Sequence, residues 1–568
     1  MEVLTKSPDT ERLSADKATP GRLHSSRLPA VVAIASVVVA TLLIFWSYRE
    51  LGQTWDESAH IGTGMQWLVQ GRYTIDAIDP PLPRVSTAVG PWLLGIRYFG
   101  LPDESGAINP WDEGNRILDA HGNAQLHTVL TAARLGILPY FLIAAFLTWR
   151  ITRRWLGAWP AAMAVFLFAI CPPVLAHASI ATTDMAFTAT FLLAVDLIWL
   201  AFHDPRPWRC AVAGIAFGLA CISKLSAAPY LVLCGFVFLV YVLWKKRIFP
   251  RAVAWLVFFV AVAVTIWAGY HFSVGSLATN DPKSQLTVAH ALQKLGPAKA
   301  VVAALVNHLP ANQYFQGLRV AQRFKKYPPP GYLFGHVYYG GRWYFYPVII
   351  LLKTPIPFML LLLIGAVYAI RRLISGSDEF ALVPLVAIVS PILVATMSHV
   401  NLGVRHVLVI YPFFAMLAAL AAVELYRKFE SSRKVVLGAV IVLLGWQFVG
   451  TLRSAPDFLT YFIEPVASRG GYIAIDSDYD WGQGLFELHD KLAQLHASDV
   501  AIAYSGAANL DSYDLPGWRK LSGDNQPVKG WVAVSDTMLH AHPDQFGWVL
   551  QYKPVAVAGK TFYIYHVD

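Results

Sequence analysis

Two adjacent acidic residues follow the first apolar run of the chain, in the segment Trp55–His60. Neighbouring side chains do not share a helix face, so we expect Asp56 and Glu57 to have different roles. One of them could act as a general base near a membrane surface, because a carboxylate can take the proton of a hydroxyl group. His60 is a further candidate for contact with the molecule that carries this hydroxyl group. An acidic, solvated start of a loop is the alternative interpretation.

Two further segments place polar side chains at the ends of apolar runs. His177 and Asp184 frame a short polar connection, and Asp184 suits the N-cap of the helix that follows, although capping and function can coexist. Asn401, Arg405 and His406 open a later apolar run, and arginine can bind a phosphate group in bidentate fashion. A lipid headgroup anchor or an ion pair is the alternative for this segment.

Three more charged residues lie within apolar runs, where charges are costly. Lys224 and Lys353 could reach a phosphate, or they could extend to the membrane interface. Asp196 lies twelve residues after Asp184, which is roughly 18 Å along a helix. We therefore expect Asp196 to be a structural partner unless the protein is a transporter.

The spacing of acidic residues in the segment Asp476–Glu487 imitates a calcium-binding loop. Trp481 stands where that loop needs glycine for its turn, so the sequence does not favour calcium. The four cysteines show no zinc spacing and no disulfide framework. The metal content of the site is left open.

These residues belong to a chain whose composition is that of a membrane protein. The 568 residues are 56% hydrophobic and only 14% charged, whereas a soluble domain carries about a quarter charged residues. The net charge of +9 belongs first to cytoplasmic loops, so we do not expect nucleic-acid binding. About eleven apolar runs approach the roughly 20 residues needed to cross a bilayer: residues 28–48, 128–149, 159–175, 185–202, 210–226, 228–244, 252–273, 346–370, 380–397, 404–424 and 435–452.

The charges of the short loops predict the orientation. With residues 1–27 as a cytoplasmic tail, every inside loop is basic, as the positive-inside rule requires. Those loops contain Arg150, Arg153 and Arg154; Arg206 and Arg209; Lys245, Lys246, Arg247 and Arg251; Arg371 and Arg372; and Arg427, Lys428, Arg433 and Lys434. The short outside connections, residues 176–184 and 398–403, contain no Lys or Arg. The sequence therefore predicts a cytoplasmic N-terminus and an extracytoplasmic C-terminus.

Three extracytoplasmic segments are large. Residues 50–127 form the first loop, expected as amphipathic helices that make one wall of a cleft, and residues 273–346 form a second loop that is aromatic and basic. Residues 453–568 read as a small α/β domain after a transmembrane domain of residues 28–452. Strand-like runs in it are 472–475, 499–504, 530–534 and 561–567, and a helix-like pattern covers 484–496.

With these residues in hand, the chain resembles the GT-C membrane glycosyltransferases, and in particular glycosyltransferase family 39, the protein O-mannosyltransferase and aminoarabinose-transferase group. The resemblance covers roughly residues 30–450. It rests on the following residues: Asp56-Glu57 in a long first loop, Asp184 in the second outer connection, Tyr346-Pro347 with Lys353-Thr354-Pro355, Gly403-Val404-Arg405-His406 with Tyr411-Pro412, and the segment Asp476–Gln483, the last three being similar to a bacterial phospholipid-carrier-dependent subgroup.

The resemblance implies a GT-C-like helical bundle and a sugar donor linked to polyprenyl phosphate, used on the outer face of a bacterial inner membrane. It implies transfer to a hydroxyl group with inversion, with Asp56 as the base and with Glu57 and Asp184 as its catalytic neighbours. Arg405, His406, Lys224 and Lys353 would bind the donor phosphate, and His60, His177 and Asn401 would contact the sugar or the acceptor. A divalent cation is compatible with the resemblance, because members of this fold differ in their need for one.

The resemblance leaves the sugar and the acceptor open, and the acceptor could be a lipid, a glycan or a protein. The alternatives to a glycosyltransferase are a secondary transporter, supported by the number of spans and by Asp196, and a non-catalytic protein that binds a lipid-linked sugar. The transporter alternative has the weaker support, because the charged residues gather at the outer ends of the runs and not near their middles.

Overall fold

The computed structural model describes residues 27–104, 106–246, 252–278, 290, 293 and 299–568. The predicted cytoplasmic tail lies outside the described residues except for Arg27, as do Arg247 and Arg251 of one basic loop. Part of the second predicted loop, between residues 279 and 298, also lies outside them.

The described part of the chain is mostly helical and spans a membrane several times. Nine of its helical segments are long and apolar enough to cross a bilayer, or ten if one bent pair counts as a span. The long helices are α1 (Leu28–Glu50), α5 (Asn123–Leu135) continuing into α6 (Leu138–Leu156), α9 (Asp184–His203), α11 (Ala227–Lys246), α12 (Ala252–Gly269), α17 (Ile356–Ile374), α18 (Leu382–Met397), α19 (Tyr411–Lys428) and α20 (Arg433–Ser454). The predicted polytopic helical fold is thereby confirmed.

Proline interrupts two of the predicted spans. Residues 159–175 form α7 (Ala158–Ala169) and α8 (Pro172–Ala178), which meet at an angle of 64° where Pro172 begins the second helix. Residues 346–370 form α16 (Phe345–Lys353) and α17, because Thr354 before Pro355 adopts an extended conformation. A third predicted span, residues 210–226, is the 15-residue helix α10 (Pro207–Cys221), which packs against α9 and α12.

The first predicted loop is a compact set of helices and not a solvated segment. It contains α2 (Glu57–Gln70), α3 (Pro81–Leu93) and α4 (Pro110–Leu118). The first ten residues of α2 are all buried, because α3 and α4 pack against this helix. The second loop contributes α14 (Lys299–Asn307), α15 (Asn312–Lys326), the short pair β1 (Val274–Gly275) and β2 (Leu309–Pro310), and the hairpin β3 (Gly331–Leu333) and β4 (His336–Tyr338).

The C-terminal region contains a five-stranded mixed sheet with the order β6-β5-β7-β9-β8. The strands are β5 (Ala501–Ala503), β6 (Arg519–Lys520), β7 (Gly530–Ser535), β8 (Ala556–Ala558) and β9 (Phe562–Val567), and α22 (Leu485–Gln494) packs against β8. Three predicted strands and the helix are confirmed. The predicted strand 472–475 is wrong: α21 (Gly470–Ile473) covers its start, and the carbonyls of Tyr472 and Ile473 accept hydrogen bonds from the β3–β4 turn.

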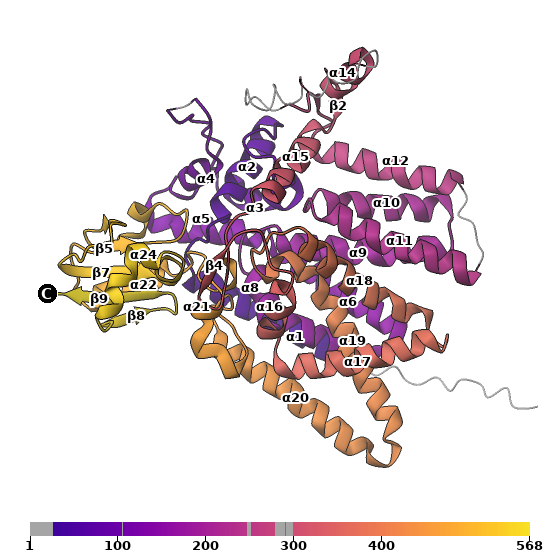
Figure 1. The fold of residues 1–568 in the computed structure, drawn as a ribbon. Helices are drawn as coiled ribbons and strands as arrows, with labels where there is room; N and C mark the ends of the chain where they lie inside the picture. The colour runs from indigo at the N-terminus through magenta and orange to yellow at the C-terminus, as the bar shows by residue number, and fades with distance from the viewer. Residues whose placement is uncertain (1–26, 105, 247–251, 279–289, 291–292, 294–298) are drawn as a thin grey trace, which may run out of the picture.

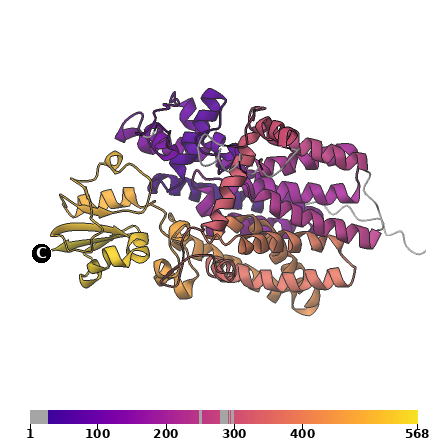
Figure 2. The ribbon, with the colours of Figure 1, turned by 45° about the horizontal axis from the view of Figure 1, so that its top comes forward.

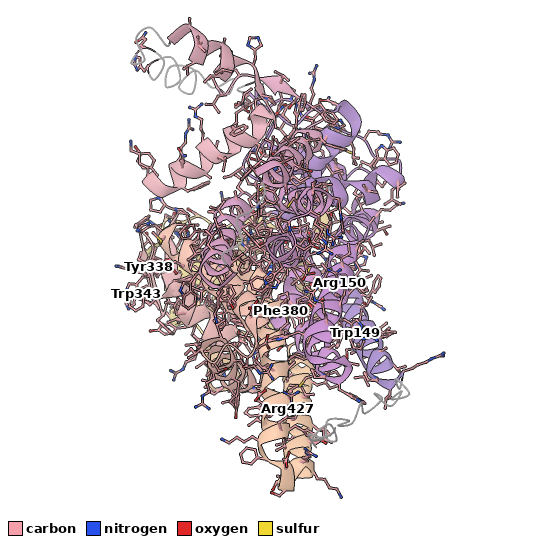
Figure 3. The ribbon with its side chains drawn as sticks, turned by 90° about the vertical axis from the view of Figure 1, so that its right-hand side faces the viewer. Trp149, Arg150, Tyr338, Trp343, Phe380 and Arg427 are labelled. Carbon is pink, nitrogen blue, oxygen red and sulfur yellow. The ribbon has the colours of Figure 1, made fainter. Side chains whose placement is uncertain are left out.

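The C-terminal domain and the helices α2 to α5 lie together at one end of the helical bundle (Figures 1 and 2). The opposite end, which faces the viewer in Figure 3, carries arginines held by acids of other segments. Arg150 Nη2 lies 2.7 Å from Asp196 Oδ2, and Arg372 Nη1 lies 2.9 Å from Asp378 Oδ2. Arg154 also pairs with Asp196, so the intramembrane acid Asp196 is neutralised at this end.

The crossing of α17 and α19 depends on glycine. A Cβ atom at Gly365 would lie 1.8 Å from the carbonyl oxygen of Leu417, whereas a Cβ atom at Gly438 in α20 would meet nothing within 4 Å. We expect Gly365→Ala to lower the unfolding free energy by about 1–3 kcal/mol, because the helices must separate. Gly438→Ala should be neutral or stabilising, because alanine favours helix. Thermal unfolding of both variants in one detergent measures the difference, and equal melting temperatures would contradict this packing.

Candidate functional site

Glu57 is a fully buried structural carboxylate. Its Oε1 accepts hydrogen bonds from Arg134 Nε at 2.8 Å and from the amide of Ala181 at 2.7 Å. Its Oε2 accepts from Arg134 Nη2 at 2.9 Å and from the amide of Thr54 at 2.8 Å. Arg134 also donates to the carbonyls of Leu51 and Gly52. Glu57 therefore joins the first loop, α5 and the connection before α9.

The environment of Glu57 keeps it charged. Burial alone would raise the pKa of Glu57, but Arg134 and the hydrogen bonds from Thr54 and Ala181 outweigh it and hold the pKa below its usual value. Because both oxygens already accept two hydrogen bonds, Glu57 has no free lone pair for a substrate. We expect a positioning role for Glu57 and not a catalytic one.

Asp56, the neighbour of Glu57, points to a different partner. Arg405 Nη1 donates a hydrogen bond to Asp56 Oδ2 at 2.7 Å, and the guanidinium lies 4.3 Å from the ring centre of Trp481. Burial alone would raise the pKa of Asp56. The charge of Arg405, followed by that of His60, outweighs burial, so the pKa of Asp56 lies below its usual value. Among the described residues, nothing donates to Asp56 Oδ1. This oxygen is ionised and available at neutral pH.

The segment that carries Arg405 is fixed by the start of the C-terminal domain. Ser477 Oγ donates to the carbonyl of Leu402 at 2.8 Å, and the amide of Val404 donates to Asp478 Oδ1 at 3.0 Å. Between them, Gly403 has φ +97°, and a Cβ atom there would lie 2.5 Å from Ser477 Oγ. Only glycine allows both this backbone conformation and this approach. The Gly403–Arg405 motif is thus a docking point for the C-terminal domain.

A cavity of about 610 Å³, here called the helix-side cavity, lies between the first loop, α15 and the outer ends of the spans. Its polar lining includes Asp56, His60, Arg84, Lys224, Arg405 and His406, and its apolar lining includes Leu225, Pro229, Tyr230, Leu318, Phe324 and Val394. The first loop forms one wall, as the sequence predicts.

Charged partners orient the polar groups of the helix-side cavity. Lys224 Nζ bonds to Asp184, which also lies 3.9 Å from His177 Nδ1. Arg84 Nε donates to His60 Nδ1 at 2.9 Å, which leaves the His60 proton on Nε2. Asp184 is the first residue of α9, and Thr183 is the N-cap of this helix. The prediction that Asp184 is the N-cap is therefore wrong.

The second cavity, here called the domain-side cavity, has a volume of about 580 Å³, and the C-terminal domain forms part of its wall. Its lining includes Trp55, Tyr332, Asn401, Asp476, Ser505 and Asp544. Three residues belong to the walls of both cavities: Asp56, Leu402 and Arg405. The two cavities therefore adjoin at the Asp56–Arg405 ion pair.

The structure assigns different partners to two groups singled out in the sequence. Lys353 Nζ donates to the carbonyl of Leu459 at 2.7 Å and also to that of Asp478, and Lys353 is absent from the walls of both cavities. Its position therefore suits a structural role better than phosphate binding.

The acids of the calcium-like segment are likewise held apart. Asp478 bonds to Val404, whereas Asp480 Oδ2 accepts from the amide of Thr537 at 2.8 Å. Within the described ranges, no group of three or more His, Cys, Asp or Glu side chains is arranged to hold a metal ion.

Sequence reasoning missed three residues of the site. Two of them are Arg134 and Arg84, which are both at most 1% exposed. The sequence signal for a buried role was the position of each arginine within or beside an apolar run. Asp476 was read only as part of a calcium-like segment, but it lines the domain-side cavity with φ +57°. Burial, opposed by Arg405 and assisted by Asp56, raises the pKa of Asp476 to about 6.

Glu57→Gln tests the positioning role. The substitution leaves the buried Arg134 without a counter-charge, so we expect the unfolding free energy to fall by about 3–5 kcal/mol. Glu430→Gln is the matched control, because the Glu430 side chain is 77% exposed and, among the described residues, pairs only with Arg433 on the surface. Thermal unfolding and the folded yield from membranes measure both variants. A Glu57→Gln protein as stable as the control variant would contradict the role of Glu57.

Comparisons with known proteins agree with the membrane fold and with the predicted resemblance. Residues 124–270 match the family model described as dolichyl-phosphate-mannose-protein mannosyltransferase. The chain is 24% identical to undecaprenyl phosphate-alpha-4-amino-4-deoxy-L-arabinose arabinosyl transferase 2 of Sodalis glossinidius (strain morsitans) over 193 residues. This aligned length is 34% of this chain and 30% of that protein. The match thus spans less than a third of the relative's length.

Similar solved structures come from two kinds of protein. ArnT from Cupriavidus metallidurans in the apo state has a TM-score of 0.46 at 15% identity, covering 94% of this chain and 98% of ArnT; bound to undecaprenyl phosphate it has a TM-score of 0.46 at 14% identity, covering 95% and 98%. The apo oligosaccharyltransferase of Archaeoglobus fulgidus has a TM-score of 0.45 at 12% identity, covering 93% of this chain and 72% of that chain. The chain is a multi-span membrane protein, and its match to the mannosyltransferase family over residues 124–270 confirms the predicted resemblance to glycosyltransferase family 39.

Proposed function

We propose that this chain is a membrane glycosyltransferase that moves a sugar from a polyprenyl-phosphate donor to a hydroxyl acceptor. The observation that carries the proposal is the position of Asp56 and Arg405 in the walls of two adjoining cavities. A transfer reaction needs two substrates that meet at one point, with a carboxylate and a cation at that point. The family match and the arabinosyl transferase relative support the same reaction class.

The helix-side cavity suits the donor. A polyprenyl-phosphate sugar has a long apolar chain and one anionic phosphate. The apolar wall from Leu225 to Tyr230, which continues along α15, would take the isoprenoid chain. Lys224 and Arg405 would hold the phosphate, and the His60 Nε2–H is a further donor in this cavity. The structure of ArnT bound to undecaprenyl phosphate is one in which a similar protein holds a lipid phosphate.

The chemistry needs a base on one side of the anomeric carbon and a cation on the other. The acceptor oxygen forms a bond to the anomeric carbon while the bond from that carbon to the phosphate oxygen breaks. Asp56 Oδ1 takes the hydroxyl proton, and polyprenyl phosphate leaves with the bonding electrons. Arg405 and Lys224 stabilise the negative charge that develops on the leaving phosphate. Single displacement inverts the anomeric centre.

Asp184 and His177 would act through Lys224. Asp184 is buried against the Lys224 ammonium, and His177 lies beside it and edge-on to Trp481 at 6.5 Å. Asp184 would fix the position of Lys224 and balance its charge before the donor binds. His406, whose Nε2 has no hydrogen-bond partner among the described residues, would contact the donor from the neighbouring wall.

The orientation follows from the two ends of the bundle. The arginines at the end opposite the C-terminal domain suit the cytoplasmic face, since cytoplasmic loops are rich in basic residues. The C-terminal domain and both cavities would then face the periplasm of a bacterial cell.

The transporter alternative loses its main support. Asp196 is neutralised by Arg150 and Arg154 and is absent from the walls of both cavities. A coupling acid in a transporter lies at a substrate site near the middle of the membrane. We therefore keep the glycosyltransferase as the proposed function.

Asp56→Asn tests the base. The substitution keeps the size of the side chain and removes the proton acceptor, so we expect turnover to fall between about a hundredfold and ten-thousandfold. Release of undecaprenyl phosphate from a panel of undecaprenyl-phosphate sugars measures turnover, and binding of undecaprenyl phosphate alone should persist. Asp196→Asn is the matched control and should retain turnover. An Asp56→Asn enzyme as active as the wild type would remove Asp56 from the mechanism.

Reporter fusions test the orientation. Alkaline phosphatase is active only outside the cytoplasm, so a fusion after Asp568 should be active. A fusion after Gly376, just beyond Arg371 and Arg372 in the last turn of α17, should be inactive. Green fluorescent protein at the same two positions should give the reverse pattern. Activity after Gly376 together with inactivity after Asp568 would invert the proposed topology.

A further inference from the structure

We propose that the domain-side cavity is a binding site for a saccharide, and that the acceptor is therefore a sugar hydroxyl of a glycan or glycolipid. This inference rests on the proposed function and adds the substrate class. It assigns two residues that contact this sugar: Tyr332 from the hairpin β3–β4 and Asp476 from the C-terminal domain.

Two buried donors in the cavity wall have no partner. Asn401 is 5% exposed; its Oδ1 accepts hydrogen bonds from Tyr338 Oη at 3.1 Å and from the amide of Arg342 at 2.6 Å. These bonds fix the amide group, and its Nδ2 has no hydrogen-bond partner within the described chain. The hydroxyl of Tyr332, a residue that is 6% exposed, also has none there. Buried donors without partners are rare. Both belong to residues of the cavity wall, so a ligand that draws either side chain toward the cavity would give its donor a partner.

An acceptor group lies in the same wall. Asp476 Oδ1 accepts a hydrogen bond from the amide of Ser477 at 2.6 Å, and nothing among the described residues donates to its Oδ2. The backbone of Asp476 is left-handed, with φ +57°, a conformation that Asp tolerates better than most non-glycine residues. The wall of the cavity thus contains two residues with unpaired donors and one with an unpaired acceptor. Sugar hydroxyl groups suit this mixture, because each one both donates and accepts.

Aromatic rings complete the lining. Trp55, Tyr339 and Trp481 all lie in the cavity wall, and Trp55 is 40% exposed and Tyr339 74% exposed. Flat rings with polar edges bind ligands that have both apolar C–H faces and hydroxyl edges. Pyranose rings have this character, whereas an extended acyl chain has no use for the polar groups.

The charges of the cavity disfavour an anionic acceptor. Four carboxylates line it, those of Asp56, Asp476, Asp478 and Asp544, and Arg405 already pairs with the first of them. In the described wall, Arg405 is the one Lys or Arg residue, and His542 is the one histidine. A phosphate group would enter a field of the same sign. A neutral or cationic sugar would not.

The position of the cavity places such a sugar beside the donor. Asp56 belongs to its wall and to the helix-side wall, so a saccharide bound at Tyr332 and Asp476 would have a hydroxyl group within reach of the base. The C-terminal domain would therefore select the acceptor, and the helices would bind the donor.

Binding of simple saccharides to the full chain in nanodiscs tests the inference without turnover. The probes are methyl glycosides of mannose, glucose, galactose and N-acetylglucosamine, with phenyl phosphate and a serine-threonine hexapeptide as the competing classes, measured by saturation-transfer NMR. We expect at least one glycoside to bind. Tyr332→Phe and Asp476→Asn should each weaken this binding about tenfold, because each removes one ligand contact. Asparagine tolerates positive φ, so the backbone at position 476 should persist.

Tyr270→Phe is the matched control. Tyr270 is 2% exposed and its hydroxyl also has no partner among the described residues, but it lies in neither cavity wall. It should leave glycoside binding unchanged, and all three variants should keep the melting temperature of the wild type. Glycoside binding that is equal in all variants, binding of the phosphate or peptide alone, or binding of no probe would overturn the inference.

A separate measurement distinguishes this failure from failure of the proposed function. Undecaprenyl phosphate is titrated into the same nanodiscs. If it binds while no glycoside does, the saccharide inference is wrong and the donor site stands. If the chain neither binds undecaprenyl phosphate nor cleaves any undecaprenyl-phosphate sugar, the proposed glycosyltransferase function fails as well.

Discussion

Glu57 and Arg134 form an ion pair with no exposed surface on either side chain, and the geometry of the site depends on it. Two charges taken out of water are expensive unless every donor and lone pair is used. Here all four lone pairs of the Glu57 carboxylate and most of the Arg134 donors are used, because the pair also bonds the backbone at Leu51, Gly52, Thr54 and Ala181. The chain between α1 and α2 can therefore take only one path. That path places Asp56 at the boundary of the two cavities.

The adjacent acids illustrate how one motif serves two physical purposes. Glu57 points inward and accepts four hydrogen bonds, so its charge stabilises the structure and is not available to a substrate. Asp56 points toward Arg405 with one oxygen and leaves the other free. Arg405 is in turn held by the ring of Trp481 and by Gly403, which lies against Ser477. The Asp56–Arg405 ion pair thus connects the first loop to the helical bundle, and Trp481 and Ser477 connect the segment around Arg405 to the C-terminal domain.

Sequence reasoning reached the features that follow from local patterns. Apolar length predicted the spans, and short strand-like runs predicted β5, β7 and β9. It joined α16 and α17 into one span because apolar length was counted through Pro355, although the residue before a proline is biased away from the helical conformation. It selected Asp56, Asp184, Lys224 and Arg405, since charges beside apolar runs stand out. It did not find Asp476 or Tyr332 as cavity residues, because a cavity assembled from hairpin, bundle and domain leaves no spacing in the sequence.

The meeting of three segments also explains why a domain at one end of the bundle would matter for chemistry. A transferred sugar must be kept from water, because water is itself a hydroxyl acceptor. The helices can enclose a lipid-linked donor, but their outer ends open toward solvent. Residues of the C-terminal domain, Asp476, Ser505 and Asp544 among them, line the cavity of about 580 Å³ that also contains Asp56 and Arg405. Under the proposed function, an acceptor that fills this cavity would displace the water that competes with it.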